Sequence, residues 1–296
     1  MVHYKKTFGD YLFDFVLYFL VALIIAVTLY PIIYTFSMAI SDPNEAARGH
    51  VYFLPKGFSL KSLKTVLNDK NVLRYYFNTF WYTIVGTALG IVVTCLAAYP
   101  LSRPEFRRRS LFTKLILFTM FFSGGTIPTY IVVTKFLGLY NSRWAIILPQ
   151  LTTAWYVLVA KSFFEGLPGE IAESARIDGA SEYRIFAQLF MPLSKPVLAV
   201  LALYYAVSHW NGYFQAMLYL AKKDLQPLAL YVRAVVIQNS IAAIENAAVD
   251  IDAEALLSSL QIKYAVILVS VIPMLCIYPF LAKNLEKGLL IGSVKG

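Results

Sequence analysis

Six stretches of this 296-residue sequence are apolar over a length that fits the hydrocarbon core of a lipid bilayer. A helix rises about 1.5 Å per residue, so about 20 apolar residues cross about 30 Å of hydrocarbon. We predict six transmembrane helices, at about residues 12–40, 73–102, 111–134, 144–164, 196–221 and 263–283. The sequence therefore indicates an all-α membrane protein that forms a single transmembrane domain over residues 1–296.

The composition supports the same class. Hydrophobic residues make up 59% of the chain and charged residues 15%, whereas soluble domains carry about 25% charged residues. The net charge is +9, but the basic residues flank the apolar stretches and form no separate basic face, so we expect no nucleic-acid partner. Cys95 and Cys276 lie inside apolar stretches, which favours small core residues over a metal site or a disulfide.

The orientation of the chain follows from the lysines and arginines in its short loops, which concentrate on the cytoplasmic side. Residues 102–110, between the second and third predicted spans, contain four arginines. We expect this loop to be cytoplasmic, and with six spans both termini then lie in the cytoplasm as well. The outer segment 41–72 carries five basic residues of its own, so the orientation depends on the arginine density of that one loop.

A polar segment, residues 165–195, separates the fourth and fifth spans and has the local chemistry of two short helices joined by a turn. Pro168 suits a helix start, Gly179 suits a left-handed stop, and Ser181 can cap a second helix. Apolar side chains then recur at helical spacing, at Tyr183, Phe186, Leu189 and Phe190. Pro192 is expected to end this helix, and Ser194 to cap the fifth span. These residues alone leave open an ordinary amphipathic connector that lies on the membrane.

The sequence Glu173-Ser-Ala-Arg-Ile-Asp178-Gly-Ala, followed by Phe186, Leu189, Pro192 and Pro196, resembles the EAA loop of ATP-binding-cassette importer permeases. It departs at Ser174, where that loop usually has alanine, a residue of nearly the same size. Other segments are similar to the carbohydrate-uptake branch of these permeases, and within it to permeases for larger or acidic oligosaccharides. They are Asn78-Thr79, Met120–Pro128, Leu137–Asn141, His209–Phe214 and Ile291–Gly296.

The resemblance implies that residues 165–195 form a cytoplasmic coupling loop that docks on an ATPase subunit. It implies coupling roles for Glu173, Ala175, Asp178, Gly179, Ala180, Phe186, Leu189 and Pro192. Glu173 would contact the ATPase surface, Gly179 would make the turn, and Phe186 would seat in the ATPase cleft. The chain contains no Gly-Lys dipeptide and therefore no P-loop, so we expect no catalytic residue here and ATP and Mg²⁺ in the partner.

The same resemblance implies the other partners. They are a second homologous permease, two ATPase subunits, an extracytoplasmic sugar-binding protein and an oligosaccharide substrate. The chain would be a multi-pass protein of the bacterial cytoplasmic membrane.

Polar and aromatic residues in the fifth span, with one residue of the second, suggest a sugar pathway, because aromatic faces suit sugar C–H surfaces and amides bind hydroxyls. The residues are Asn78, Tyr205, His209, Trp210, Asn211, Tyr213 and Phe214. The alternative is that most of them are helix-packing or interfacial aromatics, with His209 a core histidine whose hydrogen bonds are satisfied. Gly124-Gly125 and three prolines in or beside spans indicate either broken helices along the pathway or simple kinks.

Two rival functions predict different sequence features. A secondary carrier or channel working without an ATPase would carry charges deep in its spans and an internal repeat, and neither is visible. A membrane-embedded enzyme would need a nucleophile with a base, or a set of metal ligands. His3, His50 and His209 lie in unrelated segments without metal-ligand spacing.

We predict that the chain, extracted from its native membrane in mild detergent, co-purifies with an ATPase subunit. The composition of the purified complex, measured by mass spectrometry, tests this prediction. Stand-alone transport by the isolated chain in liposomes would instead support a carrier.

Overall fold

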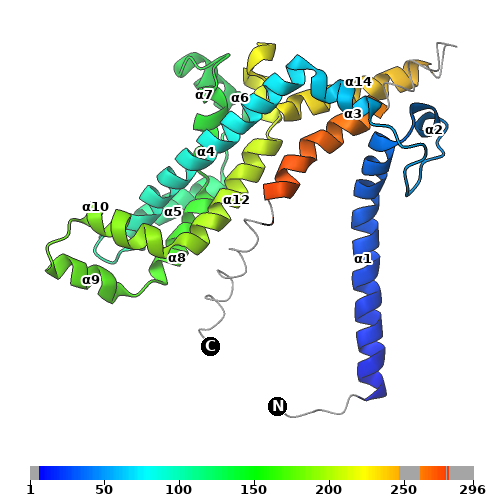
Figure 1. Ribbon diagram of the computed structural model, residues 1–296. Coiled ribbons are helices and arrows are strands. Elements are labelled where there is room, and N and C mark those ends of the chain that lie inside the picture. Colours follow the sequence, from blue (N-terminus) through cyan, green and yellow to red (C-terminus); the bar gives the residue numbers. More distant parts are fainter. Residues whose placement is uncertain (1–6, 247–260, 278, 280–296) are drawn as a thin grey trace. The chain divides into compact units, whose positions relative to one another are not determined.

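The computed structural model describes residues 7–246, 261–277 and 279, and every regular element in these ranges is helical (Figure 1). The chain divides into two compact units. One comprises residues 1–70 and 234–271, and the other comprises residues 71–233 and 272–296.

The first unit begins with the long helix α1 (Phe8–Ile40), whose amino end carries a capping box between Thr7 and Asp10. None of the residues in its most apolar 18-residue window is buried in the protein. Only its last turn, from Ser37 to Ile40, is buried. An apolar helix with this exposure requires lipid or another protein around it.

Short helices follow α1 in this unit: α2 (Pro43–Ala47) and α3 (Lys61–Asn68). The buried side chain of Gln261 links α3 to the end of α1. Its carbonyl accepts a hydrogen bond from the Ser62 hydroxyl at 2.5 Å, and its amide donates to the carbonyls of Met38 and Ser41. These carbonyls belong to the end of α1, where intrahelical partners run out.

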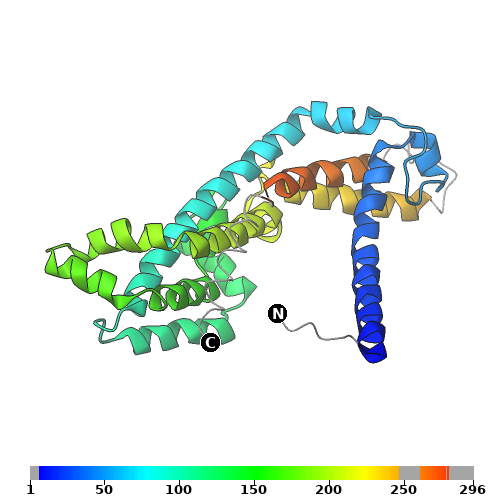
Figure 2. The same ribbon diagram turned by 60° about the horizontal axis from the view of Figure 1, so that its bottom comes forward.

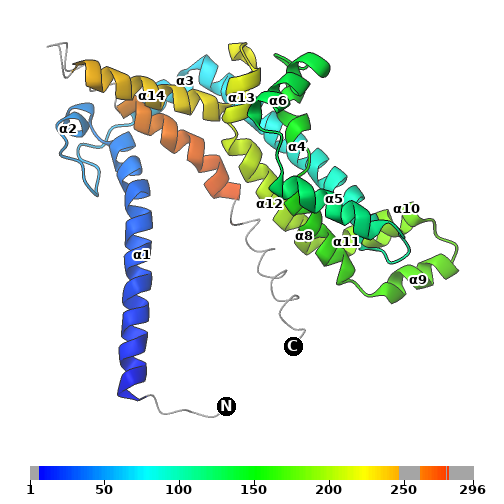
Figure 3. The same ribbon diagram turned by 180° about the vertical axis from the view of Figure 1, so that it is seen from behind.

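The second unit is a bundle of helices in which the hairpin of α9 and α10 lies at one end and α6, α7 and α13 lie at the other (Figures 1 and 3). Its elements are α4 (Lys70–Ser102), α5 (Arg109–Phe121), α6 (Thr126–Ile131), the π-helical turn η1 (Val132–Phe136), α7 (Trp144–Ile147), the 3₁₀ turn η2 (Leu148–Gln150), α8 (Ala154–Glu165), α9 (Gly169–Ile177), α10 (Glu182–Ile185), the π-helical turn η3 (Phe186–Phe190), α11 (Met191–Leu193), α12 (Lys195–Asn211), α13 (Phe214–Tyr219) and the 3₁₀ turn η4 (Lys223–Leu225). Helices α14 (Leu228–Asn246) and Gln261–Ile277 contribute residues to both units.

The predicted membrane spans are only partly continuous. Among the described residues, α1 and α4 are each long and apolar enough to cross a bilayer, and up to five crossings result if each bent helix pair counts as one. Two of the predicted spans are bent: within 111–134, α5 and α6–η1 meet at 110°, and within 144–164, α7–η2 and α8 meet at 52°. Of the two alternatives for Gly124-Gly125, a broken helix or a simple kink, the structure has the break. The fifth predicted span, 196–221, is interrupted between α12 and α13.

The sixth predicted span, 263–283, falls partly outside the described residues. Its described part is the apolar helix that ends at Ile277. The count of six spans therefore stays a prediction.

Helices α4 and α12 cross at very short distance through a pair of glycines (Figure 2). A Cβ atom placed on Gly86 would lie 2.4 Å from Nε2 of His209, and one on Gly90 would lie 2.7 Å from the ring of Tyr205. Each pair is spaced four residues apart, so both glycines and both rings lie one turn apart on facing helix surfaces. Small residues at this spacing allow membrane helices to approach closely.

We predict that Gly86→Ala and Gly90→Ala each lower the midpoint of thermal unfolding in detergent. Overpacking a filled site costs about 1–3 kcal/mol, which exceeds the helix-propensity gain of about 1 kcal/mol for Gly to Ala. Gly124→Ala is the matched control, because its Cβ would meet only Pro128 Cβ at 4.0 Å. A raised unfolding midpoint in either variant would contradict the close packing of Gly86 and Gly90 against the rings of His209 and Tyr205.

Candidate functional site

The turn between α9 and α10 is a Schellman motif centred on Gly179. The Gly179 amide donates to the Arg176 carbonyl at 3.0 Å, and the Ala180 amide donates to the Ala175 carbonyl at 2.9 Å. Gly179 has a φ of 78°, in the left-handed region that side-chain-bearing residues disfavour. The left-handed stop predicted at Gly179 is confirmed.

The second helix of the hairpin starts as predicted and ends differently. Ser181 Oγ accepts a hydrogen bond from the Arg184 amide at 3.4 Å, so the predicted cap is confirmed. The helix continues through η3 and α11 and ends at Leu193, one residue beyond the end predicted at Pro192. The carbonyls of Phe190 and Met191 accept hydrogen bonds from the Ser194 amide.

The chain turns by 80° between this segment and α12. Ser194 was expected to cap α12 with its side chain, and this expectation is wrong. Its hydroxyl is buried and makes no hydrogen bond to the described residues.

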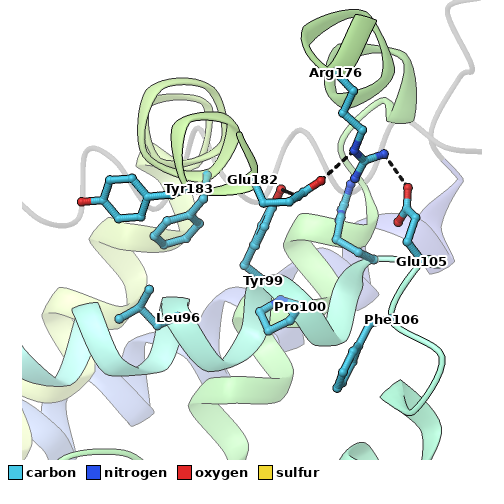
Figure 4. A pocket seen from close by; sticks show the side chains of 10 residues that line it. Leu96, Tyr99, Pro100, Glu105, Phe106, Arg176, Glu182 and Tyr183 are labelled. Atoms are coloured by element: carbon cyan, nitrogen blue, oxygen red, sulfur yellow. Dashed lines mark hydrogen bonds and ion pairs between the residues drawn. The ribbon is translucent and has the colours of Figure 1, made fainter. Parts of the chain in front are cut away.

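Four side chains join the hairpin to the rest of the bundle (Figure 4). The Arg176 guanidinium on α9 donates to Glu105 at 2.5 Å and to Glu182 at 2.7 Å. The Tyr99 hydroxyl on α4 donates to the second oxygen of Glu182 at 2.9 Å. This Arg176 cluster (Tyr99, Glu105, Arg176 and Glu182) links α4, the loop after it, and both helices of the hairpin.

Charge pairing keeps the cluster ionised. The hydrogen bond from Arg176 lowers the pKa of Glu182, and the pKa of Glu105 is lowered by its own backbone amide and then by Arg176. The same bonds, first that to Glu182, raise the pKa of Arg176. Both glutamates are more than half exposed, and exposed ion pairs contribute at most about 1 kcal/mol each. The cluster therefore acts mainly by fixing the orientation of the hairpin.

Arg103 makes a second link beside the cluster. Its guanidinium donates to the Phe164 carbonyl at 2.5 Å and to the Ser102 hydroxyl at 3.0 Å, and it lies 4.5 Å from the centre of the Phe190 ring. The Phe164 carbonyl belongs to the last turn of α8, where intrahelical donors run out. Arg103 thereby links the last turn of α8 to the end of α4.

A groove of about 390 Å³ lies between the hairpin and the end of α4 (Figure 4). Its walls are largely apolar, and the Arg176 cluster forms one rim. The lining residues are Leu96, Tyr99, Pro100, Arg103, Glu105, Phe106, Arg176, Glu182, Tyr183 and Phe186.

The predicted coupling residues divide into an exposed and a packed set. Glu173, Asp178, Gly179 and Pro192 are exposed, whereas Ala175, Ala180 and Leu189 are half-buried against the core.

Phe186 differs from its expected role as an anchor in a partner's cleft. It is 9% exposed and packs within this chain, 5.1 Å between ring centres from Tyr99. The π-helical turn that begins at Phe186 changes which side chains share a face, and the sequence pattern did not indicate this turn.

Sequence reasoning missed several residues of the hairpin. Ile177, which the sequence analysis did not single out, is 86% exposed, and Tyr183, which it expected on the apolar face of the second helix, is 76% exposed. Arg176 lies inside the EAA-like motif, but its pairing with Glu105, 71 residues away, has no signal in the local sequence.

Two predicted pathway residues make hydrogen bonds within the protein. The Asn78 amide donates to the carbonyls of Asp224 and Gln226, and its oxygen accepts from Arg143 at 3.0 Å. The buried Tyr205 hydroxyl lies 2.6 Å from the Thr94 hydroxyl and donates to the Leu151 carbonyl at the break before α8.

The remaining pathway residues also divide by burial. Trp210 is buried with its ring 5.1 Å from that of Phe80, whereas Asn211, Tyr213 and Phe214 are exposed. His209 is buried, but neither ring nitrogen finds a partner among the described residues, so the expectation of a satisfied core histidine is wrong. No group of metal-ligating side chains occurs in the described ranges.

Comparisons with known proteins cover almost the whole chain. No family model matches it. The chain is 41% identical to Protein LplC of Bacillus subtilis (strain 168), over 92% of this chain and 90% of that protein. It is 35% identical to the polygalacturonan/rhamnogalacturonan transport system permease protein YtcP of the same strain, over 96% and 99%. It is similar to a chain in the crystal structure of a bacterial ABC transporter involved in the import of the acidic polysaccharide alginate, with a TM-score of 0.84, 32% identity, and coverage of 95% and 99%.

We predict that Gly179→Val accelerates hydrogen–deuterium exchange of the α9–α10 hairpin in the purified protein. A left-handed backbone costs a side-chain-bearing residue about 1–2 kcal/mol, and nothing lies within 4 Å of the new Cβ, so the effect is conformational and not steric. Gly169→Val is the matched control, since its surroundings are equally open and its φ is ordinary. Equal exchange in the two variants would show that the turn tolerates a side chain.

Proposed function

The chain belongs to the permease subunits of ATP-binding-cassette importers for oligosaccharides and polysaccharides, and from this we propose that it forms half of a translocation pathway coupled to ATP hydrolysis in partner subunits. The second half is a homologous permease. Two ATPase subunits bind ATP and Mg²⁺, and an extracytoplasmic binding protein delivers an oligosaccharide.

The observation that carries this proposal is the α9–α10 hairpin and its attachment. The hairpin lies at one end of its bundle and exposes two apolar side chains, Ile177 and Tyr183, beside the acidic Glu173 and Asp178. An apolar centre with a polar rim is the usual composition of a protein-binding surface. We assign this surface to the ATPase.

The orientation of the hairpin agrees with that assignment. Glu105 belongs to the arginine-rich loop 102–110, and its ion pair with Arg176 brings that loop and the hairpin together. Short loops rich in arginine lie on the cytoplasmic side, where ATP is hydrolysed. We therefore place the hairpin and both termini in the cytoplasm.

The Arg176 cluster supports a route for the motion. The hairpin continues covalently into α8 and, through α11, into α12. The cluster adds a third, non-covalent link, from Glu182 to Tyr99 on α4. A displacement of the hairpin by the ATPase would thus move α4 together with α8 and α12, as in rigid-body switching of packed elements.

Helix α4, which this route would displace, also contacts other parts of the bundle. Helix α4 holds α12 through Gly86 and Gly90, and it holds the segment after α13 through Asn78. A movement at its cytoplasmic end is therefore transmitted toward the opposite end of the bundle.

We predict that Arg176→Gln in the complete reconstituted importer lowers ATP-driven sugar uptake relative to ATP hydrolysis by roughly fivefold or more, the usual lower bound of coupling between sites. The reason is that the variant loses the ion pair with Glu105, in the loop directly after α4, and the bond that orients Glu182 toward Tyr99, so the link between hairpin and α4 is weakened. Uptake of labelled sugar and phosphate release are measured on the same proteoliposomes.

Lys161→Gln is the matched control. It removes an ion pair of 2.8 Å between Lys161 and Glu165, but that pair lies within the single helix α8. Arg176→Lys, which keeps the charge, should recover part of the coupling. Full coupling in Arg176→Gln would overturn the proposed route through α4, and an importer without ATP-dependent uptake would overturn the proposed function itself.

A further inference from the structure

Three helix breaks of the second unit meet around one cavity. The breaks lie between α5 and α6, between η2 and α8, and between α12 and α13. The cavity has a volume of about 260 Å³. Its lining comprises Ser123, Gly125, Thr126, Thr129, Pro149, Gln150, Phe214, Gln215, Leu218 and Tyr219. We call it the helix-break cavity.

The coincidence of three breaks has a physical meaning in a membrane protein. Each interruption of a helix frees backbone N–H and C=O groups, and hydrocarbon offers them no partner. Non-helical backbone in a membrane is tolerated only where protein buries it or where it lines a polar cavity. Breaks beside a single cavity are the arrangement by which transporters place polar groups around a substrate.

The side chains around the cavity carry hydrogen-bonding capacity that the protein does not use. The side chains of Thr126, Gln150 and Gln215 make no hydrogen bond to the described residues. Each glutamine amide offers two donors and an acceptor, and a threonine hydroxyl offers both functions. Sugar hydroxyls need this mixture of donors and acceptors.

An apolar surface completes the lining. Phe214 presents a ring that is 42% exposed, and Tyr219 is held in place by stacking on Tyr130 with 5.8 Å between ring centres. Aromatic faces pack well against the C–H face of a sugar ring. None of the ten lining residues carries a charge.

We propose that the helix-break cavity is a subsite of the translocation pathway that holds one sugar ring through its hydroxyl groups and its C–H face. The proposal rests on the proposed function. The volume is slightly below the lower limit of about 300 Å³ for small-molecule pockets, which fits a single ring and not a longer oligosaccharide. Because the lining is uncharged, the subsite recognises neutral and acidic sugars alike, and any selection of carboxylates takes place elsewhere.

The subsite differs from the pathway expected from the sequence. Only Phe214 belongs to both sets. Gln150 and Gln215 come from two different broken helices, and the sequence shows no pattern that brings them together.

Cysteine labelling tests occupancy of the cavity directly. Gln215→Cys is made in a chain with Cys276→Ser, since Cys276 is exposed and Cys95 is buried. The complete importer in detergent is treated with a water-soluble maleimide, with and without millimolar trigalacturonate or maltotriose. We expect both sugars to slow labelling several-fold, to a similar extent.

Gln238→Cys is the control for this measurement, because Gln238 is exposed on α14 and lies outside the cavity. Its labelling should not respond to either sugar. Absence of protection at position 215 by both sugars overturns the subsite. Protection by trigalacturonate alone overturns the inference that charge is ignored.

A second variant tests function. Gln150→Leu combined with Gln215→Leu removes both amides at similar size, and we expect uptake to fall roughly tenfold while the importer still assembles and hydrolyses ATP. Gln238→Leu is the control and should retain wild-type uptake. Wild-type uptake by the double variant overturns the subsite and leaves the proposed function intact. Failure of the proposed function would instead appear as loss of ATP-dependent uptake in the unmodified importer.

Discussion

A backbone N–H or C=O group that lies in hydrocarbon must find its partner inside the protein, and the architecture of the second unit depends on how this constraint is met. Where helices are continuous, the hydrogen bonds within each helix meet this constraint. Where they break, side chains from other helices supply the partner. The Tyr205 hydroxyl donates to the Leu151 carbonyl at the break before α8, and the Asn141 side chain accepts from the amides of Ala221 and Lys222 after α13. Breaks are therefore specified by long-range contacts as much as by local residues.

Helix α4 is the element on which these contacts converge. Along one face it presents Asn78 to the segment after α13, Gly86 and Gly90 to α12, and Thr94 to Thr152 in the break before α8. At its other end Tyr99 reaches the α9–α10 hairpin. The proposed coupling needs a helix held at many points, because close-packed interfaces switch between discrete arrangements and do not deform continuously.

The exposed and the packed face of the hairpin carry different side chains and have different surroundings. Ile177 and Tyr183 face outward, whereas Phe186 and Ile185 are buried in the core of the same chain. The Arg176 cluster lies between these faces and orients one relative to the other. In the proposed coupling, Phe186 would therefore act through packing inside this chain.

The sequence by itself determined the features that depend on near neighbours. Apolar length set the membrane class, and Gly179 and Ser181 set the turn and the start of α10, because capping and left-handed backbone are decided within a few residues. Gly124-Gly125 indicated a break or a kink at 122–125, and the tertiary structure decided for the break. The tertiary structure alone decided the bend at 151–153, the inward placement of Phe186, and the meeting of Arg176 with Glu105. It also brought Gln150 and Gln215 to one cavity. These features join residues far apart in the chain, and their geometry depends on how whole helices cross, which apolar length and local propensity do not encode.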